Sequence, residues 1–127
     1  MSLEANKKTV LDFMASLSAG RPDVSLLTDD AVWWVPGRGI IDRATFFGIA
    51  ATVNDLFVEP PVMKISAVTA EDDRVAVEAA VCAPLKDGRV YDNTYHFLFH
   101  LRGGKIREAR EHNNSVVPAR LFAGTLG

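Results

Sequence analysis

The sequence predicts an α+β fold, in which three N-terminal helices cover one face of a strongly bent, mostly antiparallel sheet. Apolar residues recur at helical spacing in the first half of the chain and at every second position in the second half. The connections between the later strands are so short that only antiparallel hairpins can join them. Helices followed by a run of strands are typical of a sheet covered by helices on one side.

Three helices are expected. The first extends from Leu3 to Ala19 and ends at Gly20. A second, of about two turns, extends from Asp23 to Leu27. The third extends from Arg43 to Phe57, with Asp42 as its N-cap. The apolar stripe of the first helix consists of Val10, Phe13, Met14 and Leu17.

Five strands are expected. A run that contains both tryptophans covers Ala31 to Val35, and the proline and glycines of residues 36–39 end it. Pro118 to Phe122 could form one closing helical turn. The four later strands are Val62 to Ala70, Arg74 to Ala83, Arg89 to Arg102 and Lys105 to Ser115.

Length and composition predict one ordinary domain over residues 1–127. The chain of 127 residues is 48% hydrophobic, carries a net charge of −2 and holds one cysteine, Cys82. This charge argues against a nucleic-acid partner, and a single cysteine excludes an internal disulfide. The sequence shows no secretory signal and no apolar stretch of membrane-spanning length, so we expect a cytoplasmic protein with no membrane partner.

Alternation divides the strand of residues 89–102 into two faces. The more apolar face, expected against the helices, holds Tyr91, Asn93, Tyr95, Phe97, Phe99 and Leu101. The other face holds His96 and His100. In the preceding strand both faces are mostly apolar, which indicates that both are covered. Since three helices cannot cover both faces of the sheet, we predict a homodimer through the outer face.

The register of the last hairpin decides which charges point inward, and two registers are open. A two-residue turn at Gly103-Gly104 sets His96 opposite Glu111. A three-residue loop sets Tyr95 opposite Glu111 instead. Only the second sends Glu108 and its charged neighbours outward, and burying unpaired charge is costly. We therefore favour the second register, which turns Glu111 inward.

Two segments resemble the SnoaL-like proteins of the nuclear-transport-factor-two-like superfamily. They are VSLLTDDAVWWVPGRG, which begins at Val24, and GRVYDNTYHFLFHLRGGKIREAREH, which begins at Gly88. The resemblance implies a cone-shaped fold of three helices and a curved sheet, usually dimeric, with a pocket for small and often hydrophobic molecules. The superfamily includes ketosteroid isomerase and limonene epoxide hydrolase.

The resemblance also bears on two known chemistries. Glu111 falls where limonene epoxide hydrolase has a catalytic carboxylate, but Glu78 and Ala80 replace the other two members of that triad. The general base of ketosteroid isomerase falls on Val35. Neither known mechanism is therefore expected here.

The face assignment and the resemblance together predict one site. Carboxylates in an apolar cavity have raised pKa values and suit proton transfer near neutral pH. Amide and phenol groups can donate hydrogen bonds to a carbonyl or enolate oxygen. A purely structural hydrogen-bond network of the same side chains is the alternative. We predict Glu111 and Glu78 as catalytic residues and Tyr95, Asn93, Trp34 and Phe13 as ligand contacts.

No metal or cofactor is expected. His96 and His100 share a face but lie roughly 13 Å apart on an extended strand. His112 is expected on the neighbouring strand, and such spacing does not form a compact ligand set. No nucleotide-binding fingerprint is present.

Three functions are compatible with the pattern. The first is a cofactor-free isomerase, cyclase or dehydratase that acts on a small hydrophobic carbonyl compound. The second is a non-catalytic carrier or sensor of such a ligand. The third is a dimerisation domain whose pocket is vestigial.

Overall fold

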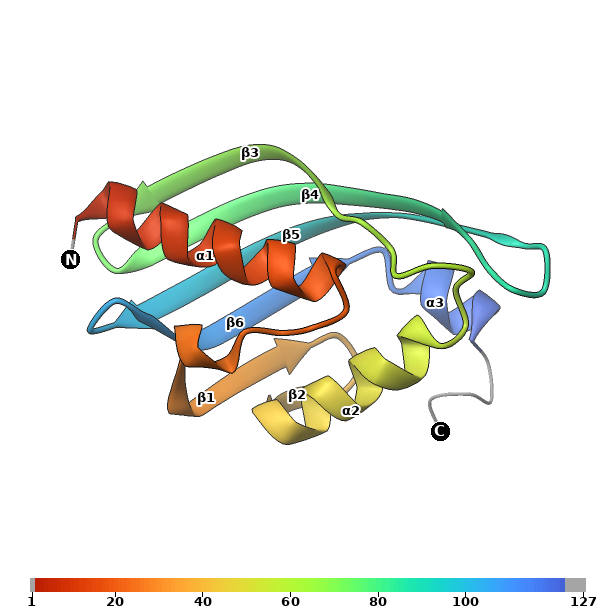
Figure 1. The fold of residues 1–127 in the computed structure, drawn as a ribbon, viewed down its shortest axis with the longest axis horizontal. Helices are drawn as coiled ribbons and strands as arrows, with labels where there is room; N and C mark the ends of the chain where they lie inside the picture. The colour runs from red at the N-terminus through yellow and green to blue at the C-terminus, as the bar shows by residue number, and fades with distance from the viewer. Residues whose placement is uncertain (1, 123–127) are drawn as a thin grey trace.

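The computed structural model describes residues 2–122, and its elements confirm the α+β class. Four strands in succession follow two helices and a hairpin, and a short helix closes the described chain (Figure 1). The elements are α1 (Leu3–Ser18), η1 (Val24–Leu26, a 3₁₀ turn), β1 (Leu27–Val35), β2 (Gly39–Asp42), α2 (Arg43–Asn54), β3 (Lys64–Glu71), β4 (Arg74–Pro84), β5 (Val90–Arg102), β6 (Lys105–Asn113) and α3 (Val116–Leu121).

The strands form one curved sheet in the order β2-β1-β6-β5-β4-β3. β1 runs parallel to β6, and the other neighbouring pairs are antiparallel. β2 was not expected from the sequence. Gly37 and Gly39, with φ of 83° and 76°, turn the chain back into a hairpin with β1 instead of simply ending a strand. α1 and α2 lie on the same side of the sheet, which we call its inner face (Figure 1).

Local chemistry explains where α2 begins and ends. The Asp42 carboxylate accepts a hydrogen bond from the Thr45 amide at 2.8 Å, which confirms the predicted N-cap. The helix ends at Asn54, three residues before the predicted end. Phe57 leaves the helix because it pairs with Leu85 in an isolated bridge and is buried there.

The main core lies between α1, α2 and the inner face. Trp33 is its centre, with its ring 5.6 Å from the Phe13 ring and 4.2 Å from the Phe46 ring. Burying one such side chain contributes about 2–3 kcal/mol. The buried inner residues of β5 confirm the face assignment for that strand. They are Tyr91, Asn93, Phe97, Phe99 and Leu101, with Tyr95 partly buried.

Neither predicted register of the last hairpin is correct, although the predicted orientation of Glu111 is. A two-residue turn pairs Arg102 with Lys105. A bulge at Arg107 then adds one residue to β6, so that Phe97 lies opposite Glu111. Glu111 therefore shares the inner face with Phe97, as the three-residue loop would also have required.

None of the helices in residues 2–122 is long and apolar enough to cross a bilayer.

Candidate functional site

A cavity of about 870 Å³ lies between the inner face and the helices. The end of α1, one side of α2 and α3 close it from the helix side. Its wall is predominantly apolar, which suits a hydrophobic organic ligand. The polar and charged side chains on this wall, among the described residues, are Ser18, Arg38, Asn54, Tyr91, Tyr95, Glu111, Asn113 and Ser115.

Glu111 is the acidic group of this wall. Its side chain is partly accessible through the cavity and otherwise enclosed by protein. Burial raises the pKa of Glu111 from 4.5 to about 7, while a hydrogen bond from Asn113 opposes that rise. The Asn113 amide nitrogen lies 2.9 Å from Oε2 of Glu111. The carboxyl can therefore accept and release a proton near neutral pH.

Two tyrosines of β5 lie on the same wall as Glu111. The hydroxyl groups of Tyr91 and Tyr95 are hydrogen-bonded to each other. Burial raises the pKa of both phenols, that of Tyr95 by the larger amount, and the charge of Glu111 adds to the effect. Both hydroxyls are therefore neutral at physiological pH and can donate a hydrogen bond.

Asn93 holds the tyrosine pair and does not itself line the cavity. Its amide nitrogen donates to the Tyr91 hydroxyl at 2.9 Å and to the Asn114 carbonyl at 3.2 Å. Its oxygen accepts from the backbone amides of Thr94 and Asn114. Each donor and acceptor site of this buried side chain is occupied. The predicted ligand contact of Asn93 is therefore wrong, and the side chain holds the Tyr91 hydroxyl in place instead.

The predicted inward placement of Trp34 is wrong. Trp33 faces the core, opposite Ala109, so the next residue along the strand faces the outside. There the Trp34 ring lies 4.9 Å from the His112 ring, and the Arg110 guanidinium lies 5.0 Å from its centroid.

The predicted placement of Glu78 in the cavity is also wrong. It pairs with His96 on the outer face, and its carboxylate accepts a hydrogen bond from Ser66 at 3.0 Å. Its exposed side chain and Glu111 lie on opposite sides of the sheet. The structure does not bring the two carboxylates together.

Phe13, the remaining predicted contact, is a core residue. It is fully buried against Trp33 and is not part of the cavity wall. Leu17, one turn later on α1, lines the cavity in its place.

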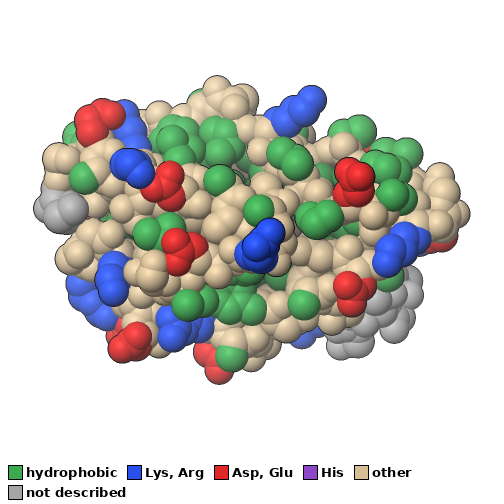
Figure 2. Space-filling model, in the orientation of Figure 1, with side chains coloured by type: hydrophobic (Ala, Val, Ile, Leu, Met, Phe, Trp, Pro, Cys, Tyr) green, Lys and Arg blue, Asp and Glu red, His purple; other side chains and the backbone are tan. Residues whose placement is uncertain are grey.

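The outer face carries all the histidines of the chain, three in number. No histidine is visible on the helix-covered face shown in Figure 2, where charged side chains surround hydrophobic patches. A second hollow of about 670 Å³ lies on the outer face beside Glu78, His96 and His112. Within residues 2–122, no three His, Cys, Asp or Glu side chains are grouped closely enough to hold a metal ion.

Comparison with protein-family models resolves the identity of the fold. Residues 10–109 match the model of the SnoaL-like domain. This chain belongs to the SnoaL-like domain family. The SnoaL-like match confirms the resemblance seen in the sequence and ends two residues before Glu111. A comparison with curated proteins finds no match.

Solved structures show the same fold at low identity. AclR from Streptomyces galilaeus, assigned as a hydroxylase, is 18% identical with a TM-score of 0.82, over 94% of this chain and 82% of its own. A protein from Jannaschia assigned as a SnoaL-like polyketide cyclase is 16% identical with a TM-score of 0.81, over 95% and 93%. An NTF2-like protein from Anabaena variabilis is 22% identical with a TM-score of 0.75, over 90% and 93%.

Two wall residues were not singled out from the sequence. Tyr91 lies on the face expected against the helices, and it is buried there with its hydroxyl hydrogen-bonded to that of Tyr95. Asn113 lies two residues from Glu111 on the same strand face and donates a hydrogen bond to its carboxyl. That spacing was the signal that could have found it.

Proposed function

We propose that this SnoaL-like chain is a cofactor-free isomerase, cyclase or dehydratase that acts on a small hydrophobic carbonyl compound. The observation that carries the proposal is Glu111, a carboxyl with a pKa of about 7 on an otherwise largely apolar cavity wall. Structural relatives assigned as polyketide cyclases support the same class of substrate.

Glu111 is the general base of the proposed reaction. Its carboxylate removes a proton from the carbon next to the carbonyl group. The electron pair of that C–H bond forms a C=C bond, and the π pair of the carbonyl group moves onto its oxygen to give an enolate. The protonated Glu111 then returns the proton at another carbon in an isomerisation. In a cyclisation or dehydration, it returns the proton to the new hydroxyl or the leaving oxygen.

Tyr95 stabilises the enolate oxygen in this proposal. Since Asn93 donates to the Tyr91 hydroxyl, the Tyr91 proton can be given to Tyr95. The proton of Tyr95 then remains for the ligand oxygen. A neutral donor prepared in an apolar site stabilises developing negative charge more than water does.

Proton exchange tests the proposal without knowledge of the natural product. Cyclic ketones and β-dicarbonyl compounds are incubated with the protein in D₂O, and deuterium at the carbon next to the carbonyl is followed by NMR. Wild type should accelerate exchange, and Glu111→Gln should reduce that acceleration by about 10²-fold or more.

Glu78→Gln is the matched control, because it makes the same chemical change on the outer face and should exchange like wild type. Equal exchange by wild type and Glu111→Gln would contradict the assignment of the base. Tight binding of these compounds without any exchange would instead favour the carrier or sensor.

We also propose that the chain forms a homodimer through the outer face, as the sequence suggested. That face presents Val90 and the half-buried Trp34 and Leu98 among its polar residues. Exposed apolar groups of this kind are typical of an interface. A single domain over residues 1–127 and a cytoplasmic location also stay predictions.

A further inference from the structure

Asn113 and Glu111 form an isolated pair at the end of β6. Both side chains face the cavity, and the only hydrogen bond of the Asn113 side chain within residues 2–122 is the one to Glu111. The Asn113 oxygen, Oδ1, is buried and has no partner there. Nothing else in the described chain therefore fixes which end of the amide faces the carboxyl.

Asn93, on the neighbouring strand, shows what a fixed amide looks like. Four hydrogen bonds hold its nitrogen and oxygen in place. Turning it would break all of them. Turning Asn113 by 180° about its terminal bond breaks only the contact with Glu111, and it brings the oxygen to the place of the nitrogen.

The two orientations complement the two protonation states of Glu111. With the nitrogen toward Oε2, Asn113 donates to the ionised carboxylate. With the oxygen toward Oε2, it accepts a hydrogen bond from the protonated acid. A general base occupies both states in every turnover.

We propose that Asn113 is a positioning residue that holds the Glu111 carboxyl in both protonation states by reversing its amide. The catalytic meaning of this inference rests on the proposed function, but the hydrogen-bond exchange itself does not. An aliphatic side chain at this position could support neither state, and a second carboxylate would oppose ionisation.

The other charged or titratable groups on the described cavity wall are few. β5 presents Tyr91 and Tyr95, and the β1–β2 connection presents Arg38. The parts of α1, α2 and α3 on this wall contribute no titratable side chain. The titration of Glu111 is therefore sensitive to the one amide in contact with it.

The test follows the Glu111 carboxyl by infrared spectroscopy as a function of pH, without substrate. The Glu111 band is assigned by difference against Glu111→Gln. In Asn113→Leu the midpoint should rise by about one pH unit, a tenfold change in proton affinity, because the charge-assisted hydrogen bond lost by the ionised form is stronger than the neutral one lost by the protonated acid. The carboxyl C=O band of the protonated acid should also shift in this variant, because the acid loses the acceptor that the reversed amide provides. Asn54→Leu is the matched control: it removes another cavity-wall asparagine, one with no hydrogen bond to Glu111, and should leave the midpoint unchanged.

Asn113→Asp keeps the shape of the side chain and serves if the leucine variant does not fold. A carboxylate beside Glu111 should raise its midpoint further, since two like charges cannot both ionise at this distance. An unchanged midpoint in either folded variant, or an unshifted band of the protonated acid in Asn113→Leu, would overturn the proposal. If both the midpoint and the band shift but wild type shows no exchange activity, the proposal is upheld and the proposed reaction is rejected. Exchange activity with neither shift would do the reverse.

Discussion

The acidity of Glu111 depends on where the fold places it. Its neighbours in sequence, Arg110 and His112, point to the other face of the sheet, so the Arg110 guanidinium does not lie beside the Glu111 carboxyl. The described wall near Glu111 offers one amide and two neutral phenols instead. The charged form is thus poorly solvated, which is why its pKa lies far above that of an exposed glutamate.

This shift predicts how stability depends on pH. The pKa of Glu111 is about 7 in the folded chain and 4.5 in the absence of burial. The contribution of this group to the free energy of unfolding is therefore greatest below pH 4.5. That contribution is lost as pH rises through 7. Glu111→Gln removes the charge, so it should be more stable than wild type above pH 8, by up to about 3 kcal/mol before screening by cavity water, and nearly equal to it at pH 4.

Urea unfolding of both proteins at several pH values measures this difference. The comparison isolates Glu111, because every other titrating group is common to the two chains. Glu78→Gln, which alters an exposed carboxylate, should show no such pH-dependent gain. A constant difference between wild type and Glu111→Gln from pH 4 to 9 would contradict the assigned burial of the charge.

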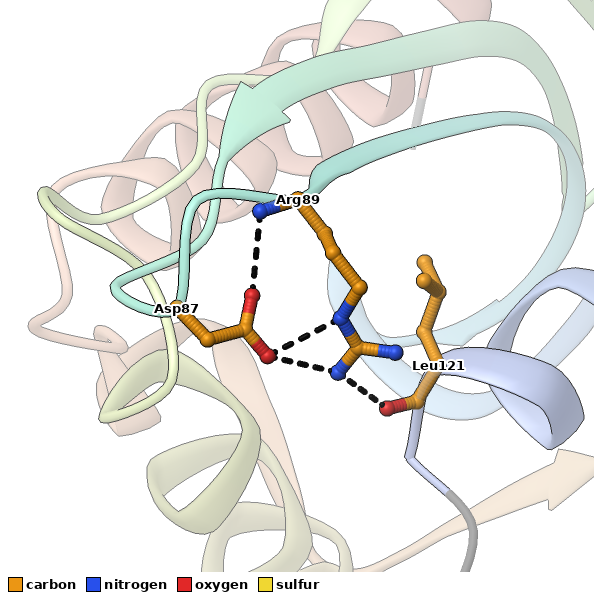
Figure 3. A network of polar contacts seen from close by, with 3 residues as sticks. All are labelled: Asp87, Arg89 and Leu121. Atoms are coloured by element: carbon orange, nitrogen blue, oxygen red, sulfur yellow. Dashed lines mark hydrogen bonds and ion pairs between the residues drawn. The ribbon is translucent and has the colours of Figure 1, made fainter.

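At the scale of elements, a polar contact joins the β4–β5 hairpin to α3. The Arg89 guanidinium donates to the Asp87 carboxylate at 2.7 and 2.9 Å and to the Leu121 carbonyl at 2.9 Å (Figure 3). α3 is only six residues long and would not be stable alone. Since Pro118 and Ala119 line the cavity, this contact helps to close the site.

Arg89→Ala should therefore loosen α3 and leave the sheet intact. In hydrogen exchange, the amides of Ala119 and Phe122, which bond within α3, should lose protection. Amides in the middle of β5 should not. Arg74→Ala removes a comparable exposed Arg–Asp pair at the β3–β4 turn and serves as the control. Unchanged exchange of α3 in Arg89→Ala would mean that packing of Phe122 alone holds the helix.

At the scale of the whole molecule, the sheet separates two environments. The inner face carries the core and the cavity, and the outer face carries the histidines, Glu78 and scattered apolar side chains. Because one layer of strands separates the two faces, each face can have its own function. Proton transfer is proposed for one, and association with a second copy for the other.

Light scattering after size exclusion tests this association. Wild type should elute as a dimer at micromolar concentration, and Leu98→Lys should shift it toward monomer, because it puts a charge in the middle of the outer face. Lys8→Glu, on the exposed side of α1, changes charge elsewhere and should stay dimeric. A wild-type monomer at that concentration would contradict the dimer.

Most of the fold could be predicted because it depends on local periodicity. Helical spacing located α1 and α2, and alternation located the four long strands. β2 escaped prediction because four residues after a glycine-rich turn carry too little pattern. The extra residue at Arg107 escaped for a different reason: a bulge leaves no local signature in such a sequence.

The site was predicted less completely. Glu111 and Tyr95 both line the cavity because each lies on the more apolar face of its own strand. Glu78 alternates with the valines of β4, so consistent use of alternation indicates the outer face for it. For Trp33 and Trp34, alternation shows only that they point to opposite faces, and the packing of Trp33 in the core decides which one faces inward. The actual partners of Glu111 and of the tyrosine pair, Asn113 and Asn93, depend on side-chain geometry.

Periodicity and motifs within single segments are enough to predict the family, the fold class and the inner face of the long strands. Which polar groups meet depends instead on the tertiary structure. Bulge position, strand pairing and the packing of α3 bring residues from β5, β6 and the helices together. Those contacts, and the desolvation they impose on Glu111, belong to no single segment of the chain.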